Sequence, residues 1–145
     1  MPTHLILSTD LLAQVITHCK SVYPNEACGL LAGPNEHVEK IYKMTNIEQS
    51  NVSYMMDPAE QFRAVKDMRK NGDKMLAIYH SHPHSPACPS PKDVSLAFYP
   101  DAVYLIVGLT DANQPEVKAY EIIDGKVREA RIESTIDAPV SNGLD

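Results

Sequence analysis

The chain has 145 residues, of which 43% are hydrophobic and 22% are charged, and its formal net charge is −6. This length suits one domain with one core, and the composition excludes a disordered, collagenous or coiled-coil chain. The excess of acidic residues disfavours nucleic acid and anionic lipid as partners, because both repel a negatively charged protein.

The cysteines and the N-terminal sequence indicate a cellular compartment. No apolar run approaches the roughly 18 residues of a membrane span, and the start of the chain lacks the basic region and apolar core of a signal peptide. The three cysteines, Cys19, Cys28 and Cys88, form no CxxC pair, which argues against a disulfide framework and a thiolate zinc site. We therefore expect a soluble protein in the reducing cytoplasm, with no membrane as partner.

The first third of the chain predicts a helix followed by a β-hairpin. Ser8 offers N-cap chemistry before residues 11–22, whose apolar members recur at helical spacing, and Pro24 follows them. An apolar run at 27–33 and an alternating run at 37–44 are separated by a Gly-Pro pair. These two runs predict paired strands.

A second helix is predicted over residues 58–71. Asp57 stands in the cap position, a proline follows at the first helical position, and Asn71-Gly72 provides a stop. We expect the apolar stripe of this helix to consist of Phe62, Val65 and Met68.

Strands and a third helix are predicted in the second half of the chain. The apolar run 74–79 is too short for a helix and predicts a buried strand that leads directly into His80. After a proline-rich loop, a helix is predicted to begin at Ser90 and to continue to Pro100. Residues 102–109 give the strongest strand pattern.

The C-terminal region predicts a hairpin and a tail. Two β-like segments flank Asp124-Gly125, a dipeptide favoured in hairpin turns. The complete order of elements favours an α/β fold, either α+β or three-layer α/β/α, with a mixed sheet. We expect one domain over residues 1–133 and a flexible tail over 134–145, where no periodicity is visible.

Histidine placement gives the strongest indication of chemistry. His80 and His82 follow a predicted strand, so their side chains point to the same face. The chain continues with the spacing H-x-H-x7-S-x2-D, which ends at Ser90 and Asp93. A carboxylate in the first turn of the following helix would complete a His2Asp site and leave a fourth tetrahedral position for water.

Each of these residues also has an ordinary structural interpretation. A histidine near a strand end is usually structural, and Ser90 with Asp93 would usually be an N-cap and its partner. A shuffled sequence of this composition would contain the full spacing roughly once in a thousand trials, so we interpret the combination as a metal site. Pro83 should turn the chain, which places His84 on the loop surface or behind the ligands.

Glu26 is the candidate general acid/base. Hydrolysis of an amide needs a group that takes a proton from water and delivers one to the leaving amine. Glu26 directly precedes the apolar run 27–33, and the nearby Gly29 would allow close backbone approach. On residue chemistry alone, a solvated glutamate after a helix is the simpler interpretation.

Three segments together resemble the JAMM (MPN-plus) metalloprotease family: PNEACGLLAG at 24–33, YHSHP at 79–83 and PSPKD at 89–93. The resemblance spans residues 5–132 and implies a cytidine-deaminase-like α/β/α fold. It also implies one zinc ion per chain bound by His80, His82 and Asp93. In this family pattern Glu26 is the general acid/base and Ser90 helps to hold the oxyanion.

The chain is similar to the compact stand-alone prokaryotic members, some of which act on ubiquitin-like sulfur carriers ending in Gly-Gly. The resemblance thus implies hydrolysis of an amide or isopeptide bond after such a tail, with lysine or free cysteine as the leaving amine. The RadC branch, linked to DNA repair, shares the zinc motif. Its characteristic loop glycine is missing at 83–89, however, and no helical DNA-binding domain precedes the motif.

Two other classes of function stay open at this point. A non-catalytic MPN scaffold would keep the fold as a partner-docking surface, although such modules typically lack the metal ligands. A two-histidine, one-carboxylate site can also hold Fe(II) in an oxygenase. The sequence carries no indication of an oligomeric state.

Overall fold

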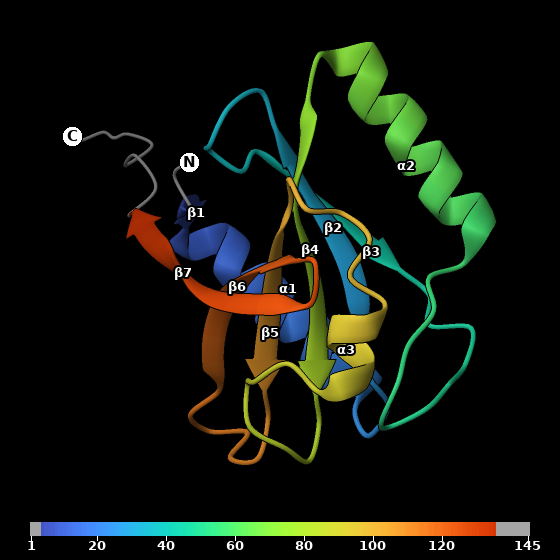
Figure 1. Ribbon diagram of the computed structural model, residues 1–145, viewed down its shortest axis with the longest axis vertical. Helices are drawn as coiled ribbons and strands as arrows, with labels where there is room; N and C mark the ends of the chain where they lie inside the picture. Colours follow the sequence, from blue (N-terminus) through green and yellow to red (C-terminus); the bar gives the residue numbers. More distant parts are fainter. Residues whose placement is uncertain (1–3, 136–145) are drawn as a thin grey trace.

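The computed structural model describes residues 4–135, in which seven strands form one mixed sheet with three helices packed against it (Figure 1). The strands are β1 (His4–Ser8), β2 (Cys28–Gly33), β3 (Lys40–Met44), β4 (Lys74–His82), β5 (Val103–Gly108), β6 (Glu116–Ile123) and β7 (Lys126–Thr135). The helices are α1 (Thr9–Val22), α2 (Pro58–Asn71) and α3 (Pro91–Ser95).

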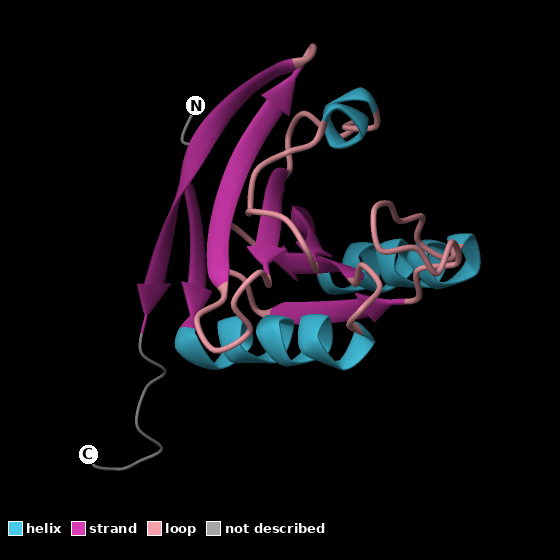
Figure 2. Cartoon of the chain, turned by 90° about the horizontal axis from the view of Figure 1, so that it is seen from below, coloured by secondary structure: helices cyan, strands magenta, loops and turns pink. Residues whose placement is uncertain are grey.

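The strand order is β1-β7-β6-β5-β4-β2-β3. The pairs β1–β7 and β4–β5 are parallel, whereas the other neighbours are antiparallel. Figure 2 shows the sheet strongly curled, with α1 along one side and the other helices across from it. This confirms the predicted three-layer α/β/α arrangement around a mixed sheet.

The central strand β4 contributes to a separate core on each face of the sheet. Successive side chains of a strand point to opposite faces. Ala77 and Tyr79 therefore pack with Val15 of α1, while Ile78 packs with Met68 of α2. The even-numbered positions of β4, which include both candidate histidines, thus lie on the face of the sheet that α2 covers.

Gly29 has a packing role in this arrangement. It pairs with Tyr79 across β2 and β4, and a Cβ at Gly29 would lie 2.3 Å from the Tyr79 ring. The Tyr79 hydroxyl in turn makes a 2.5 Å hydrogen bond with His18 Nδ1 of α1. The close approach that we expected at Gly29 therefore admits a tyrosine ring on the α1 face.

The ends of the two long helices follow the predicted capping chemistry. Ser8 accepts a hydrogen bond from Leu11 N at the start of α1, and Asp57 accepts from two backbone amides of α2. Gly72 ends α2 in the left-handed conformation at a φ of 73°, as glycine readily does. The observed α2 has the bounds that the sequence predicts.

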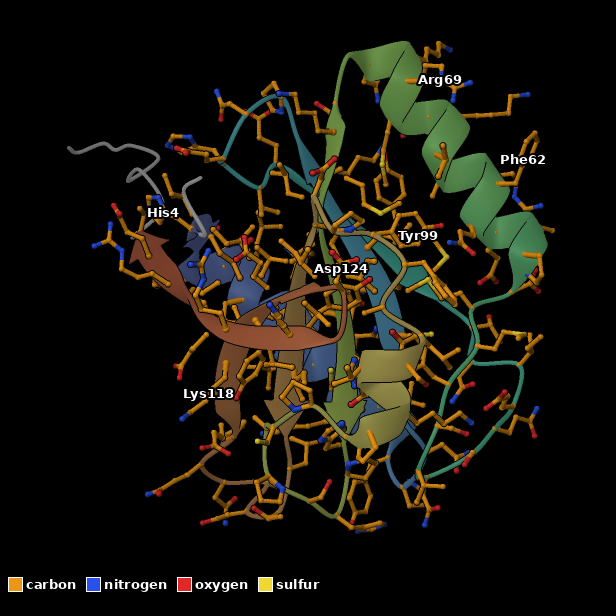
Figure 3. The ribbon with its side chains drawn as sticks, viewed as in Figure 1. His4, Phe62, Arg69, Tyr99, Lys118 and Asp124 are labelled. Atoms are coloured by element: carbon orange, nitrogen blue, oxygen red, sulfur yellow. The ribbon has the colours of Figure 1, made fainter. Side chains whose placement is uncertain are left out.

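The expected apolar stripe of α2 is partly wrong. Met68 is buried, together with Ala64, but Phe62 is 65% exposed. Positions 64 and 68 are one helical turn apart and define the face that packs on the sheet, so Phe62 points away from the sheet (Figure 3).

The third helix is shorter than predicted because the chain turns towards β5 before Pro100. α3 ends at Ser95. Further along, Tyr99 N donates to the Tyr104 hydroxyl at 3.1 Å, and Ala102 N donates to the Tyr99 carbonyl at 3.1 Å. Pro100 also disfavours a helical conformation at the residue that precedes it.

The sheet is longer at several points than the sequence predicts. β1 was not predicted, β4 continues to His82, and β7 continues to Thr135. The remainder of the predicted tail, 136–145, lies outside the described residues, so the domain boundary stays a prediction. Within 4–135, no helix is both long and apolar enough to span a membrane.

Candidate metal centre

The folded chain brings His80, His82 and Asp93 together at the end of β4. The two histidines lie on the same face of the strand and are 1% and 4% exposed. Asp93 enters from the first turn of α3, which follows β4 through a short loop. Their three donor atoms lie within 4.8 Å of one another.

The donor atoms form a nearly equilateral triangle. His80 Nε2 lies 3.2 Å from His82 Nε2, and Asp93 Oδ2 lies 3.3 Å and 3.1 Å from these two nitrogens. Ligands about 2.0–2.1 Å from a tetrahedral zinc ion are about 3.3 Å apart. The side chains therefore have the spacing and the chemistry of a zinc site with three protein ligands.

The ring of His82 is oriented by a backbone carbonyl. Its Nδ1 donates to the Pro86 carbonyl oxygen at 2.8 Å. With a proton held on Nδ1 by this bond, Nε2 is the nitrogen that can bind a metal once it has lost its own proton. The structure thus selects the tautomer of His82 that a metal ligand needs.

The ring of His80 is held differently. Its Nδ1 is buried and has no hydrogen-bond partner in the described part of the chain. The Tyr54 ring stacks on the imidazole, with centroids 4.7 Å apart and an angle of 27° between the planes. Burial lowers the pKa of His80, which favours the neutral form that binds metals.

Asp93 has a structural role in addition to its place in the triangle. Its backbone N donates to Ser90 Oγ at 3.1 Å, while its Oδ2 accepts from Ser90 N at 2.9 Å. Burial alone would raise the pKa of the Asp93 carboxyl, but hydrogen bonds with His80 and His82 hold it well below its ordinary value. Ser90 and Asp93 therefore form the capping box that the ordinary interpretation expected, and the carboxylate still faces both histidines.

Glu26 lies beside this cluster. In the β2–β4 pairing, Cys28 faces His80, and the backbone bond from Ser81 N to the Ala27 carbonyl continues the same register. One further step places Glu26 across from His82, on the same face, where facing Cβ atoms are about 5 Å apart.

The Glu26 side chain is buried, which contradicts the interpretation as a solvated glutamate. It is 4% exposed, and its Oε1 has no hydrogen-bond partner among residues 4–135. Burial raises the pKa of Glu26 to about 7, against the opposing influence of His82. An unpartnered carboxylate oxygen with a pKa near neutrality is suited to exchange protons.

Two residues hold the Glu26 segment in place. The Ser81 hydroxyl accepts a hydrogen bond from Ala27 N at 2.8 Å. On the other side, Asn46 Nδ2 donates to the Glu26 carbonyl at 3.0 Å. Ser81, which lies between the two histidines, thus helps to hold the segment that carries the candidate acid/base.

The remaining histidine of the motif loop and the cysteines lie outside the cluster. His84 is exposed, as expected for a loop-surface position. Its ring packs edge-on against Tyr23, with the two ring centroids 5.4 Å apart. All three cysteines are free thiols, with Cys19 and Cys28 buried and Cys88 exposed.

A cavity of about 270 Å³ borders Asp93 on the side of α2 and α3. Its apolar lining includes Leu30, Ile78, Leu96, Phe98 and Tyr99. The hydroxyl of Tyr99 lies 3.4 Å from Gln61 Nε2 of α2, which links the segment after α3 to that helix. An extended substrate at the cluster would therefore meet an apolar cleft.

Sequence reasoning missed Tyr54, Asn46 and the Pro86 carbonyl. Asn46 is 7% exposed and organises the segment between β3 and α2, where its Oδ1 accepts from Glu48 N and Met55 N. Tyr54 reaches His80, and Asn46 reaches the Glu26 carbonyl, from a different part of the chain, so no local pattern could have pointed to these two residues. The Pro86 carbonyl is only four residues from His82, but a backbone carbonyl leaves no signal in the sequence.

The sequence also matches a known family over most of its length. Residues 8–123 match the family described as prokaryotic homologues of the JAB domain. The chain belongs to this prokaryotic JAMM/MPN-type family. Its members among the relatives below are peptidases, and the chain is accordingly a hydrolase of the same type.

Two relatives and one solved structure show how close the similarity is. CysO-cysteine peptidase of Mycobacterium tuberculosis is 39% identical over 127 residues, which cover 86% of this chain and 87% of the relative. A probable TtuB-protein conjugate cleaving protease of Thermus thermophilus is 36% identical over 123 residues, covering 84% and 78%. The solution structure of a Desulfitobacterium hafniense protein has a TM-score of 0.84 and 40% identity, covering 94% of this chain and 96% of the other.

Proposed function

We propose that this JAMM-family chain hydrolyses the amide or isopeptide bond that follows the Gly-Gly tail of a ubiquitin-like or sulfur-carrier protein. The observation that carries the proposal is the buried Glu26 beside the triangle of His80, His82 and Asp93. The names of the relatives support the substrate class, since one relative acts on CysO-cysteine and another on TtuB-protein conjugates.

We further propose that His80, His82 and Asp93 hold one zinc ion. The support is the spacing of their donor atoms, the tautomer of His82 and the neutral state favoured for His80. When bound there, zinc supplies an acidified water molecule and polarises the carbonyl of the amide, the chemistry that hydrolysis requires.

Glu26 moves the protons in this proposal. Its unpartnered Oε1 takes a proton from the attacking water, and the same oxygen delivers that proton to the amine nitrogen as the C–N bond breaks. A nearby cation favours the charged carboxylate and so lowers its pKa from the value of about 7 that burial produces. Glu26 is then ready to act as a base at neutral pH.

Ser90 stabilises the negative charge that develops on the carbonyl oxygen. Its Oγ accepts a hydrogen bond from Asp93 N at 3.1 Å, which leaves the hydroxyl hydrogen free to be donated. A donor held in place before the reaction needs no reorganisation as the charge forms.

We also propose a cytoplasmic location. The three free thiols support it, because a reducing compartment keeps cysteines unpaired. The net charge of −6 supports protein conjugates rather than nucleic acid as substrates.

Mass analysis of defined conjugates tests the proposal. A carrier that ends in Gly-Gly is joined to free cysteine or, through an isopeptide bond, to lysine, and each conjugate is incubated with the zinc-loaded protein. We expect release of the carrier with a free Gly-Gly end. Glu26→Gln should keep zinc and lose turnover by about 100-fold or more, while Glu36→Gln in the β2–β3 turn serves as a matched control with normal turnover.

Three outcomes would contradict the proposal. Full activity of Glu26→Gln would exclude this residue as the acid/base. A folded wild-type protein that binds no zinc and cleaves no conjugate would favour the partner-docking scaffold. Iron binding with oxygen consumption would favour the oxygenase.

A further inference from the structure

The loop between His82 and α3 is attached to β6 through one residue, Ala87. Ala87 N donates to Glu116 Oε1 at 3.0 Å, and the Ala87 carbonyl accepts from the Tyr120 hydroxyl at 2.6 Å. Ala87 itself is 1% exposed. Both of its backbone polar groups are therefore held by side chains of a single strand.

The first of these bonds connects directly to His82. Ala87 N belongs to the same planar peptide group as the Pro86 carbonyl, and that carbonyl accepts from His82 Nδ1 at 2.8 Å. The Glu116 carboxylate, the Pro86–Ala87 peptide and the His82 imidazole therefore form a continuous chain of hydrogen bonds. Each bond in such a chain polarises the next and strengthens it.

Gly108 makes room for this contact. It pairs with His82 in β4 and with Glu116 in β6, so it lies between the two ends of the chain of hydrogen bonds. A Cβ at Gly108 would lie 2.9 Å from Ala87 N. Only the absence of a side chain allows the loop to pack this closely against β5.

We propose that Glu116 and Tyr120 are positioning residues for His82: Glu116 acts through the Pro86–Ala87 peptide, and Tyr120 holds the carbonyl of the adjoining Ala87–Cys88 peptide. They hold the Pro86 carbonyl where it fixes the proton on His82 Nδ1, and the Glu116 charge increases the electron density at Nε2. The inference rests on the proposed zinc site, because it assigns His82 Nε2 to the metal. It adds two residues of β6 that no motif of the sequence includes.

Tyr120 is suited to a permanent role as a donor. It is 7% exposed, and burial raises the pKa of its hydroxyl to about 12, so the group stays protonated at neutral pH. His80 has no comparable arrangement, since its Nδ1 lacks a partner among the described residues. Of the two histidines, His82 is the one whose Nδ1 is fixed by a hydrogen bond within the described residues.

Two measurements on full-length variants test the inference. Zinc affinity is measured by competition with a chelator, and the tautomer of His82 is measured by long-range 1H–15N NMR in the metal-free protein, at a pH where the imidazole is neutral. We expect Glu116→Ala and Tyr120→Phe to weaken zinc binding by about 10-fold and to reduce the population of the Nδ1–H tautomer. Glu116→Gln keeps an acceptor oxygen and should recover the tautomer, with only part of the zinc affinity.

Two matched controls exist. Glu121→Ala removes another hydrogen-bonded carboxylate of β6, whose partner is Arg128. Tyr104→Phe removes the hydroxyl of the tyrosine that pairs with Tyr120 across the sheet and bonds Tyr99 N. Neither carboxylate nor hydroxyl contacts Ala87, and we expect zinc affinity and the His82 tautomer to remain those of the wild type.

Three results would overturn the inference. Wild-type zinc affinity and an unchanged tautomer in Glu116→Ala and Tyr120→Phe would show that the β6 contacts do not reach His82. Weaker zinc binding with an unchanged tautomer and a lower thermal midpoint of the metal-free protein would assign both residues to loop stability alone. A wild type that binds no zinc would refute the proposed site, whereas the tautomer comparison would separately decide whether Glu116 acts on His82.

Discussion

The two faces of the central sheet differ in how their polar groups are satisfied. On the α1 face, Ser81 is fully buried, and its hydroxyl accepts a hydrogen bond from Ala27 N. On the opposite face, Glu26 Oε1 and His80 Nδ1 are buried and have no partner among residues 4–135. Because an unpartnered buried polar atom lowers stability, we infer that one face stabilises the fold while the other gives up stability for chemistry.

The same strands supply both faces. β4 places Tyr79 in the core beside α1 and places His80 and His82 on the opposite face. In the same way β2 places Leu31 in the core beside α1, while the segment just before β2 places Glu26 on the face of the two histidines. The pleat therefore separates the two tasks without separate domains. Substitutions on the two faces should consequently have different effects.

The largest effect should come from Asp93→Asn on the site face. The substitution removes the charge of the proposed third ligand while an amide of the same size stays in place. We expect the variant to lose zinc on dialysis and to cleave no carrier conjugate, as followed by elemental analysis and mass spectrometry. Retention of zinc at wild-type affinity would show that Asp93 is not a ligand.

Ser90→Ala should reduce turnover by about 100-fold, because it removes the proposed donor to the developing oxyanion. It should also lower the free energy of unfolding by about 1 kcal/mol through loss of the α3 cap. Ser8→Ala is the matched control, since Ser8 caps α1 in the same way. If both variants lose stability and neither loses turnover, Ser90 is only a cap.

Leu31→Ala tests the α1 face. Leu31 is fully buried in the core beside α1, and its truncation should lower the free energy of unfolding by about 3 kcal/mol. Zinc affinity and turnover, measured below the thermal midpoint, should stay at the wild-type values. A large loss of zinc affinity in the folded variant would show that the two faces are not independent.

The last effect is a pH dependence of stability. Burial raises the pKa of Glu26 from 4.5 to about 7, so the folded state binds this proton more tightly than the unfolded state. The contribution of Glu26 to the stability of the metal-free protein should therefore fall as pH rises from 4.5 to 7. Glu26→Gln has no titratable group at this position. The thermal midpoint of the variant should therefore rise relative to that of the wild type over this pH range, and the difference should then level off. A difference in thermal midpoint that does not change with pH would show that ionisation of Glu26 does not destabilise the fold.

Local chemistry made part of this structure predictable. Asp57 caps the start of α2, a proline occupies its first position and Gly72 ends it, so the bounds of this helix follow from the local sequence. The convergence of His80 and His82 follows from the period of a strand. The position of Asp93 follows from the start of α3, although the full length of that helix does not, because Tyr104 redirects the chain.

Long-range contacts decided the rest. β1 is short and pairs in parallel with β7, so that His4 faces Arg131 from the other end of the described chain. The burial of Glu26 depends on the segment between β3 and α2, which Asn46 attaches to it. Glu116 and Tyr120 reach the site only because β6 pairs next to β5. A single sequence contains no local pattern for any of these contacts.

The parallel pair β4–β5 has a consequence for the dynamics of the site. Parallel strands require a crossover connection, and here the crossover carries Asp93 while the strand before it ends in His82. A metal ion held by the proposed ligands would cross-link the strand to its own crossover and would suppress local opening of the connection. We therefore expect the backbone amides of 83–93 to show the greatest gain in hydrogen-exchange protection on metal binding, and the metal to leave through opening of this connection while the rest of the sheet stays folded.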